Sequence, residues 1–341
     1  MEERIDEKMF DFLFNAAALS LYEKLVPVEG EDGIFFPATY APLEDGSFKG
    51  GYNIDDFGGG ENLCRVDSVG SQANRIETIF KEEKYRDLVP QIIINAGSKK
   101  INLLDVGHRA GDALVRFSEL SEELTSAFLD YENGDATKMA KISPTTIVFG
   151  AWDSRNSAIK ITRIFCSEIL AENVKKLTRS AIYAPAIDYS KEGLLDGISD
   201  REKSEEGFNH VPSSKAHGGV IAKGEIYRNV VIHLNYLDSK IKDVKLKRYV
   251  LGLSLVAFLH PINGFLRSGC NLVVEGRDMS LVSNGSRKNI DLTDVLEYAK
   301  LVAKDFGVGE SREVNFQVSK VSEKLKKNKE KKEKKNKKEA E

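Results

Sequence analysis

Cysteine, histidine and tryptophan are scarce in this sequence of 341 residues, which has three cysteines, five histidines and one tryptophan. Cys64, Cys166 and Cys270 lie about a hundred residues apart, without the paired spacing of metal sites or small disulfide scaffolds. We therefore expect reduced thiols and no metal. The sequence also lacks a P-loop, a Gly-x-Gly-x-x-Gly segment after a strand and a Gly-x-Ser-x-Gly motif, so we expect no cofactor and no common catalytic signature.

Long apolar runs are also missing. The longest, from Tyr249 to Pro261, is too short and too interrupted to cross a bilayer, and its flanks, the lysine- and arginine-rich residues 245–248 and Pro261, suit a buried helix instead. The N-terminus is charged and lacks the order of regions that marks a signal peptide. These absences predict a cytoplasmic protein without a membrane segment, and the length allows one large domain with its own core.

The net charge of −3 is unevenly distributed. Residues 320–341 contain eleven lysines and five glutamates, a net of +6, which leaves about −9 on residues 1–319. The end of this tail is almost entirely Lys, Glu and Asn and predicts a disordered or solvated segment. A nucleic-acid-binding surface is usually basic, so here it would have to be a local patch on an acidic body.

The hydrophobic pattern predicts an α+β fold, because helices and strands are mixed without a regular βαβ rhythm. Helices are expected at 6–25, within 65–80 with Asp67 or Ser68 as cap, at 108–117, 122–131 and 245–260, and from Thr293 to Lys304. Strands are expected at 91–95, 101–105, 145–149, near Lys160, within 220–237 and at 270–274. We interpret residues 26–62 and 184–219 as insertions into a single domain, 1–319, followed by the tail 320–341.

A first polar cluster lies between Arg65 and Arg75 and includes Ser71, Gln72 and Asn74. Uncharged donors and an arginine at a helix N-terminus suit a phosphate group, because free amides and the helix dipole point toward the anion. An ordinary capped amphipathic helix with a polar face explains the same residues. Both interpretations stay open from the residues alone.

A second cluster places His108, Arg109 and Asp112 at helical spacing, followed by Arg116. His108 and Asp112 could act as a general base and the group that orients it, which is the nuclease interpretation. A capped helix start with an ion pair between Asp112 and Arg116 is the commoner arrangement. Neither a second acid nor a metal-ligand spacing accompanies the pair, so the sequence favours the structural interpretation.

The single tryptophan, Trp152, follows an expected strand and precedes the cations Arg155, Lys160 and Arg163. Such a segment suits single-stranded RNA, because bases stack on an aromatic ring while guanidinium groups hold phosphates. The alternative is a core tryptophan at a strand end, with Asp153 paired to Arg155. The residues do not decide between the two.

Three short segments indicate ligand binding more weakly. The first contains Arg179 and Ser180. The second is a loop of small residues that contains Lys215, His217, Gly218 and Gly219; its Gly-Gly end allows close backbone approach to a ligand, although a plain turn would also contain these residues. The third is a short glycine-bearing turn with Arg267.

Taken in order, several segments resemble the RAMP-superfamily backbone subunit of type I-G (formerly I-U) CRISPR effector complexes. They are RVDSVGSQANRIE, GHRAGDALVRFS, FGAWDSR with KITRI, LTRSAIY, HGGVIAKGEIYRN and LRSGCNLV. The resemblance implies an RRM-like (ferredoxin-like) palm with inserted finger and thumb elements. It also implies a subunit that is not an enzyme, with DNA cleavage left to a separate protein.

The resemblance further implies the partners: CRISPR RNA, a target DNA strand, other subunits of the complex, and copies of the chain in a helical filament. The candidate RNA-binding residues are Arg65, Ser71, Gln72, Asn74, Arg75, His108, Arg109, Trp152, Ser154, Arg155, Lys160, Arg163, Arg179, Ser180, Lys215, His217, Gly218, Gly219 and Arg267. One alternative is an endoribonuclease of the same superfamily that uses His108 or His217 as general base. Some relatives in other CRISPR types cut target RNA through a loop aspartate, and Asp153 is the residue to examine for that activity. Another alternative is an enzyme whose small-molecule pocket is lined by Trp152, Asp153 and Arg155.

Overall fold

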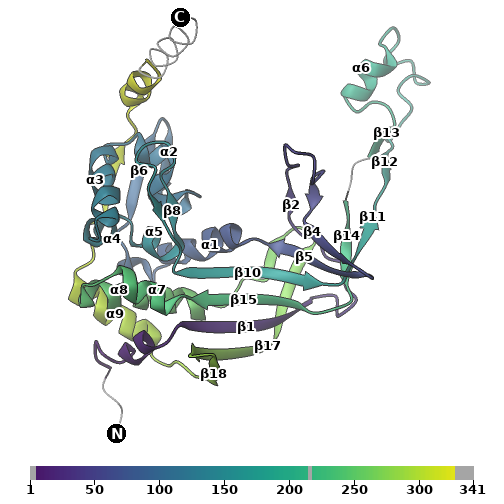
Figure 1. The fold of residues 1–341 in the computed structure, drawn as a ribbon. Coiled ribbons are helices and arrows are strands. Elements are labelled where there is room, and N and C mark those ends of the chain that lie inside the picture. The colour runs from purple at the N-terminus through teal and green to yellow at the C-terminus, as the bar shows by residue number, and fades with distance from the viewer. Residues whose placement is uncertain (1–4, 214–216, 327–341) are drawn as a thin grey trace, which may run out of the picture.

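The computed structural model describes residues 5–213 and 217–326. Its main sheet consists of β1 (Ala18–Pro27), β4 (Ile54–Gly58), β5 (Glu61–Asp67), β10 (Phe165–Glu172), β15 (Ile226–Ile232), β16 (Phe265–Arg267), β17 (Cys270–Ser283) and β18 (Ser286–Asn289). The strand order is β16-β17-β1-β15-β10-β5-β4, with β18 added to β17, and all pairs are antiparallel. The open sheet curls across the middle of the molecule (Figure 1), and the predicted α+β class is confirmed.

Side chains of the central strands alternate between a buried and a half-open face. On β1, Leu19, Leu21, Glu23 and Leu25 are buried while the residues that alternate with them are partly exposed, and β15 has the same period of two. The buried face joins one apolar core with α1 (Val69–Glu77) and α8 (Val244–Leu259). These two helices therefore cover one side of the sheet and leave the other available to a ligand.

A helical lobe occupies the chain between β5 and β10. It contains α1, α2 (Ala113–Arg116), α3 (Ser121–Glu132), α4 (Thr137–Ile142) and α5 (Pro144–Phe149), with 3-10 helices at Thr78–Lys81, Arg86–Leu88, Leu103–Asp105 and Arg109–Gly111. A small sheet joins β6 (Ile92–Ala96) to β7 (Lys99–Asn102) and β19 (Arg312–Asn315). Beside the lobe lie α7 (Leu234–Lys240), α8 and α9 (Val295–Phe306) (Figure 1). All of these elements except β7 contribute side chains to the large core.

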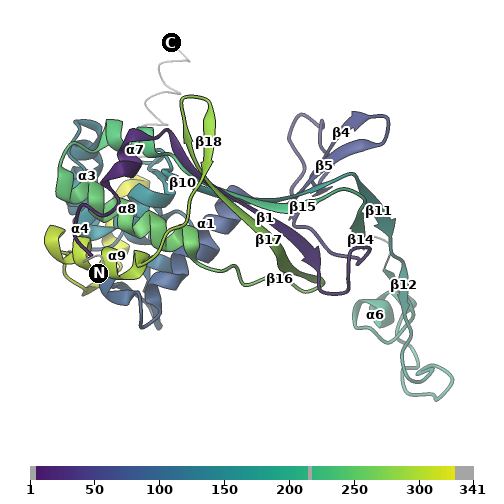
Figure 2. The same cartoon turned by 90° about the horizontal axis from the view of Figure 1, so that it is seen from below.

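An arm projects from the end of the sheet that lies away from the helical lobe (Figures 1 and 2). Its strands are β11 (Val174–Thr178) paired with β14 (His217–Ala222), and β12 (Ala181–Tyr183) paired with β13 (Val211–Ser213); α6 (Asp200–Glu205) lies near the tip. The predicted insertion 184–219 falls in this arm. The other predicted insertion, 26–62, contains β2 (Thr39–Tyr40), β3 (Gly51–Tyr52) and β4.

Several predicted elements are confirmed. Ser68 caps α1 by accepting a hydrogen bond from the Ser71 amide at 3.3 Å, and the helices α3, α8 and α9 and the strands β6 and β17 lie where they were expected. The strand expected at 101–105 is confirmed only in part, because β7 ends at Asn102 and Leu103–Asp105 is a 3-10 helix. Some bounds differ: the cap position of α9 is Asp294, one residue after the expected Thr293, and β17 runs on to Ser283. The predicted helix at 108–117 is divided into a 3-10 turn and α2.

Two predicted elements are wrong. Residues 6–25 were expected to be helical, but only Asp11–Asn15 forms a 3-10 helix and β1 begins at Ala18. The leucines of this segment alternate with period two, and β1 is paired on both sides, which overrides helix propensity. The strand expected at 145–149 is helix α5, which starts with Pro144 in the first turn and is buried throughout. A short buried run has no periodicity that separates strand from helix.

The Gly218–Gly219 pair lies at the base of the arm. Gly219 has φ +86°, and a Cβ there would be 2.7 Å from Ile34 Cγ2; a Cβ on Gly218 would be 2.6 Å from the Leu177 carbonyl oxygen. The backbone of residue Phe35 pairs here with Val220. The close approach that these glycines predicted is therefore made by the chain itself.

The three cysteines are free thiols, of which Cys64 and Cys270 are buried in a second, smaller apolar core at the base of the arm. Burial raises the pKa of Cys64 to about 12 and that of Cys270 to about 11, so neither is a ready nucleophile. Across residues 5–213 and 217–326, no helix has the length and apolarity needed to cross a membrane. The same part of the chain contains no cluster of three metal-ligating side chains.

Candidate nucleic-acid interface

A groove of about 620 Å³ lies where the helical lobe meets the sheet, and we call it the Trp152 groove. Its walls come from the loop before α2, from β8 (Ala151–Trp152) and β9 (Lys160–Ile161), and from the start of β10 and of α7. It is lined by Gly107, His108, Arg109, Gly150, Ala151, Trp152, Lys160, Ile161, Thr162, Arg163, Cys166, His233, Asn235 and Tyr236. Candidate residues from two separate motifs, His108, Arg109, Trp152, Lys160 and Arg163, thus share one groove.

Trp152 is 61% exposed, so its ring is a surface platform and not part of the core. Strand β8 pairs antiparallel with β9, and the register places Trp152 directly opposite Lys160. Directly opposed residues on such a pair project from the same face, so the indole ring and the ammonium group are neighbours. This arrangement offers a stacking surface beside a positive charge.

Arg163 and His108 add further polar groups to the groove. The Arg163 Nε–H donates to the Phe149 carbonyl oxygen at 3.1 Å, which anchors an otherwise exposed side chain. The His108 side chain is 83% exposed, and its Nδ1 lies 3.5 Å from Asp112 Oδ2. Asp112 also caps α2 by accepting a hydrogen bond from the Leu114 amide at 2.9 Å. The groove therefore combines one exposed ring with cationic and neutral donors.

Arg109 is 3% exposed and supports the groove from within. Its Nη1 donates to the Gly150 carbonyl oxygen at 3.2 Å and its Nη2 to Asn74 Oδ1 at 3.0 Å, while its Nε lies 2.7 Å from Glu77 Oε2. Burial lowers the pKa of Arg109 and raises that of Glu77 to about 7, and each charge opposes the shift of the other. Arg109 and Asn74 thus hold together α1 and the strand that carries Trp152.

Replacing Gly150 with alanine is expected to lower the free energy of unfolding by about 1–3 kcal/mol and to displace Arg163. Gly150 has φ +79°, and a Cβ there would lie 2.7 Å from Arg163 Cγ and 2.9 Å from the Ile161 carbonyl oxygen. Urea unfolding measures the change. Gly59→Ala is the matched control, because Gly59 has φ +62° but open space around it. Equal losses in the two variants would contradict the packing argument.

The first polar cluster converges on Asp67, whose side chain is fully buried. The Asp67 carboxylate accepts hydrogen bonds from Ser71 Oγ at 2.9 Å, Gln72 Nε2 at 2.7 Å, Arg75 Nε at 3.2 Å and Arg267 Nη2 at 2.6 Å. The donors at the start of α1 that predicted a phosphate cradle therefore already hold an internal anion. Arg75 and Arg267 remain partly exposed, whereas Gln72 is buried.

The other candidates are spread over the surface. Arg65 lies on the half-open face of the sheet with its Nε 3.9 Å from Glu168 Oε2, and the His217 ring lies 4.8 Å from the Tyr52 ring at a tilt of 43°. Arg179 and Ser180 are exposed on the arm. Lys215 lies outside the described residues. The structure thus gathers most of the candidates in three regions: the Trp152 groove, the surroundings of Asp67, and the arm. Arg65 on the sheet, and Ser154 and Arg155 in an exposed turn, lie outside these regions.

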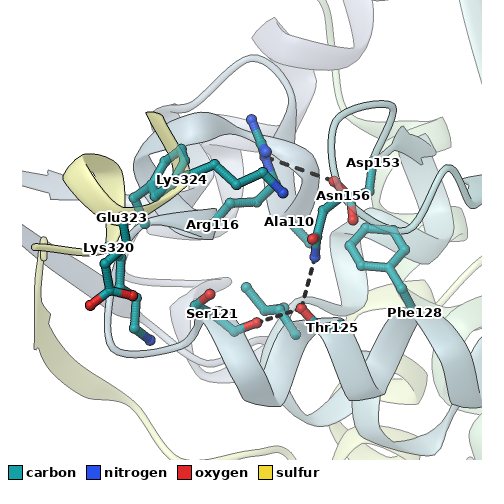
Figure 3. A pocket seen from close by; sticks show the side chains of 12 residues that line it. Ala110, Arg116, Ser121, Thr125, Phe128, Asp153, Asn156, Lys320, Glu323 and Lys324 are labelled. Atoms are coloured by element: carbon teal, nitrogen blue, oxygen red, sulfur yellow. Dashed lines mark hydrogen bonds and ion pairs between the residues drawn. The ribbon is translucent and has the colours of Figure 1, made fainter. Parts of the chain in front are cut away.

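Asp153 is buried beneath the exposed turn that contains Ser154 and Arg155. Its Oδ2 accepts hydrogen bonds from the backbone amide and the hydroxyl of Ser157 at 2.9 and 2.8 Å. Arg116 reaches toward it from α2, with Nε 3.8 Å from Oδ1 (Figure 3). The sequence suggested ion pairs of Asp153 with Arg155 and of Asp112 with Arg116. The structure instead pairs Asp153 with Arg116.

Sequence reasoning missed the wall of the groove that comes from the end of β15 and the start of α7. His233, Asn235 and Tyr236 line it, and Tyr236 adds a second aromatic ring. The sequence indicated this wall only by an Asn-Tyr pair directly after an alternating strand. The three residues reach the groove because β15 pairs with β10, which places them beside Cys166.

Fold and groove together define an α+β protein in which a curled antiparallel sheet carries a helical lobe, an arm and an exposed aromatic–basic groove. Residues 19–176, just under half of the chain, match the family described as CRISPR-associated protein GSU0053 (Cas_GSU0053). This part of the chain is therefore similar to a CRISPR-associated family, which is the class of protein that its motifs resemble. The matched segment runs from β1 into β11 and includes Asp67, Trp152 and Lys160.

Two solved structures show a weak likeness to the chain. A chain of a "CRISPR RNA-guided surveillance complex, pre-nicking" is 14% identical, with 78% of this chain and 77% of that chain covered and a TM-score of 0.33. A chain of a "CRISPR RNA-guided surveillance complex" is 10% identical, with coverages of 82% and 80% and a TM-score of 0.28. The comparison with curated proteins finds no match.

Proposed function

We propose that this chain is a non-catalytic backbone subunit of a type I-G CRISPR effector complex. In this proposal it binds CRISPR RNA, assembles with copies of itself along the RNA, and presents the guide to a target DNA strand. The observation that carries the proposal is the Trp152 groove, in which an exposed indole ring lies opposite Lys160 and next to Arg163. This combination suits single-stranded RNA of any sequence, because every base can stack and every phosphate can pair.

The strand order supports an RRM-like palm as the core of the subunit. In chain order, β1 is followed by the lobe with α1, then by β10 and β15 with the arm between them, then by α8 and β17. This is a βαββαβ sequence with large insertions, and its strands lie in the order β17-β1-β15-β10. The lobe and the arm are then the insertions that we assign as finger and thumb.

The half-open face of the sheet supplies a path for RNA from the groove toward the arm. Cys166 lines the groove and pairs with Val231; because side chains alternate, this face also carries Tyr227 and, on β1, Tyr22. The rings of Tyr22 and Tyr227 stack at 5.3 Å. Arg65 lies on the same face of β5. We propose that the RNA crosses this face, with Arg179 and Ser180 at its far end.

Co-expression with and without a matching CRISPR array tests the proposal. We expect a large RNA-dependent particle that protects intact RNA of guide length, and its loss in the triple variant Trp152→Ala/Lys160→Ala/Arg163→Ala. The variant Lys99→Ala/Lys100→Ala is the control, because it removes exposed positive charge from β7, outside the groove. A wild-type particle without RNA would refute the proposal, and steady RNA cleavage would favour the endoribonuclease alternative.

The arm supports assembly with a neighbouring copy, because apolar side chains are exposed along it. Ile182, Tyr183, Leu194 and Ile198 are between 41% and 67% exposed. Exposed apolar groups gathered on one element mark protein contacts. We propose that the arm contacts the next copy along the RNA.

Replacing Leu194 and Ile198 with aspartate is expected to leave RNA affinity within about threefold while abolishing assembly, because a buried unpaired charge opposes docking. Light scattering and RNA-binding titrations on the same samples measure both properties. Substituting Asp for Val318, an apolar residue that is 69% exposed and lies outside the arm, is the control. Normal assembly of the arm variant would remove the arm from the interface.

A further inference from the structure

A second cavity, of about 320 Å³, lies on the helix-covered side of the sheet, between α1 and the loop that follows α8. We call it the Arg228 pocket. The exposed ring of Phe265 borders it, and its polar lining consists of Arg228, Arg75, Gln72, Thr78, Glu82, His260 and Asn263. None of the residues that line the Trp152 groove lines this pocket. It is therefore a separate site.

Arg228 projects from β15 toward this cavity and is 1% exposed. Its Nε–H donates to Glu23 Oε2 on the neighbouring strand at 2.6 Å. Within the described part of the chain, its Nη1 and Nη2 atoms have no hydrogen-bond partner. Burying such donors without partners costs free energy, and a guanidinium with both terminal nitrogens free is arranged to hold two oxygens of one anion.

The charges around the pocket leave an excess of positive charge. Glu23 is shared between two arginines, because its other oxygen accepts hydrogen bonds from Arg277 Nε and Nη2 at 2.9 and 2.5 Å. Asp67 is likewise shared between Arg75 and Arg267. Each carboxylate thus neutralises one of its two guanidinium groups. Glu82, which is exposed, also lines the cavity. The four arginines therefore face three carboxylates, Glu23, Asp67 and Glu82, and one positive charge is left for an anion beside Arg228 and Arg75.

We propose that the Arg228 pocket binds a phosphate group, either free or as part of a nucleotide. Two guanidinium groups at one cavity suit a phosphate, whose oxygens can accept from both. The His260 Nδ1 is also buried without a partner in the described residues, which adds a neutral polar group. Ile79, Ile262 and Phe265 give the pocket an apolar side that fits a sugar or a base.

Calorimetric titration of the full chain, freed of nucleic acid, with inorganic phosphate tests the assignment. We expect saturable binding that weakens about tenfold or more in Arg228→Lys, which keeps the charge beside Glu23 but loses the two-pronged donor. Arg277→Lys is the matched control: Arg277 binds the same carboxylate but does not line the pocket, so phosphate affinity should not change. Phe265→Glu places a negative charge at an exposed position of the pocket and should weaken binding without affecting the core.

Equal phosphate affinity in the wild type, Arg228→Lys and Phe265→Glu, or no binding at millimolar phosphate, would overturn the proposal. If Arg228→Lys does not fold, Phe265→Glu alone decides. If single-stranded RNA competes with phosphate, the phosphate group bound in the pocket belongs to RNA. This interpretation rests on the proposed function. Binding of phosphate or adenosine monophosphate without such competition would identify a free ligand, and this result stands even if the chain binds no RNA.

Discussion

Replacing Glu23 with alanine is expected to lower the free energy of unfolding by about 3–5 kcal/mol, a large share of the stability of a typical domain. Glu23 is fully buried in the middle of β1 and is the counter-ion of Arg228, whose Nε lies 2.6 Å from it. Without the carboxylate, a guanidinium that is 1% exposed would be left as an unpaired buried charge. Urea unfolding followed by circular dichroism measures the loss.

Two variants separate this charge effect from a simple loss of packing. Arg277→Ala removes the partly exposed partner and leaves Glu23 paired with Arg228, so it should cost only about 1 kcal/mol or less. Glu23→Leu/Arg228→Met removes both buried charges and should recover most of the stability lost in Glu23→Ala. If the double variant were no more stable than the single one, the unpaired charge would not be the cause.

The elements that sequence reasoning predicted well are those whose signals are local. Helix α8 is an apolar run followed by Pro261, and α1 begins at a serine that caps it. Strand β1 gave a misleading signal, because its identity depends on partners far along the chain: Leu19 pairs with Ile232 on one side and Leu281 on the other. No window of a few residues contains that information.

The candidate site divides in the same way. Trp152, Lys160 and Arg163 lie within one short hairpin, so their grouping was visible in the sequence, and the structure places them in one groove. Asp67 was expected only as a helix cap, but its carboxylate is also bound by Arg267, two hundred residues away. The sequence marked Arg75 and Arg267 as candidate RNA-binding residues, but it did not show that both donate hydrogen bonds to the buried Asp67 carboxylate.

Removing the Trp152 ring and removing the nearby cations are expected to weaken RNA binding in different ways. Stacking of one base on an aromatic side chain contributes about 1–3 kcal/mol, so Trp152→Ala should raise the dissociation constant by roughly 5- to 150-fold. Stacking releases no counter-ions, so the dependence of affinity on salt should stay unchanged. Fluorescence anisotropy with an unstructured RNA, repeated over a series of salt concentrations, measures both quantities.

The variant Lys160→Ala/Arg163→Ala should instead change the salt dependence. Each phosphate contact on single-stranded nucleic acid contributes about 0.7 to the slope of log affinity against log salt, so losing two contacts should lower the slope by about 1.4. Lys99→Ala/Lys100→Ala removes two positive charges outside the groove and should leave the slope nearly unchanged. Equal slope changes in the two pairs would mean that RNA is attracted by the overall charge of the chain. A change confined to Lys160 and Arg163, together with a Trp152 effect that does not depend on salt, would mean that the RNA lies in the groove, with its bases on the ring and its phosphates on the two cations.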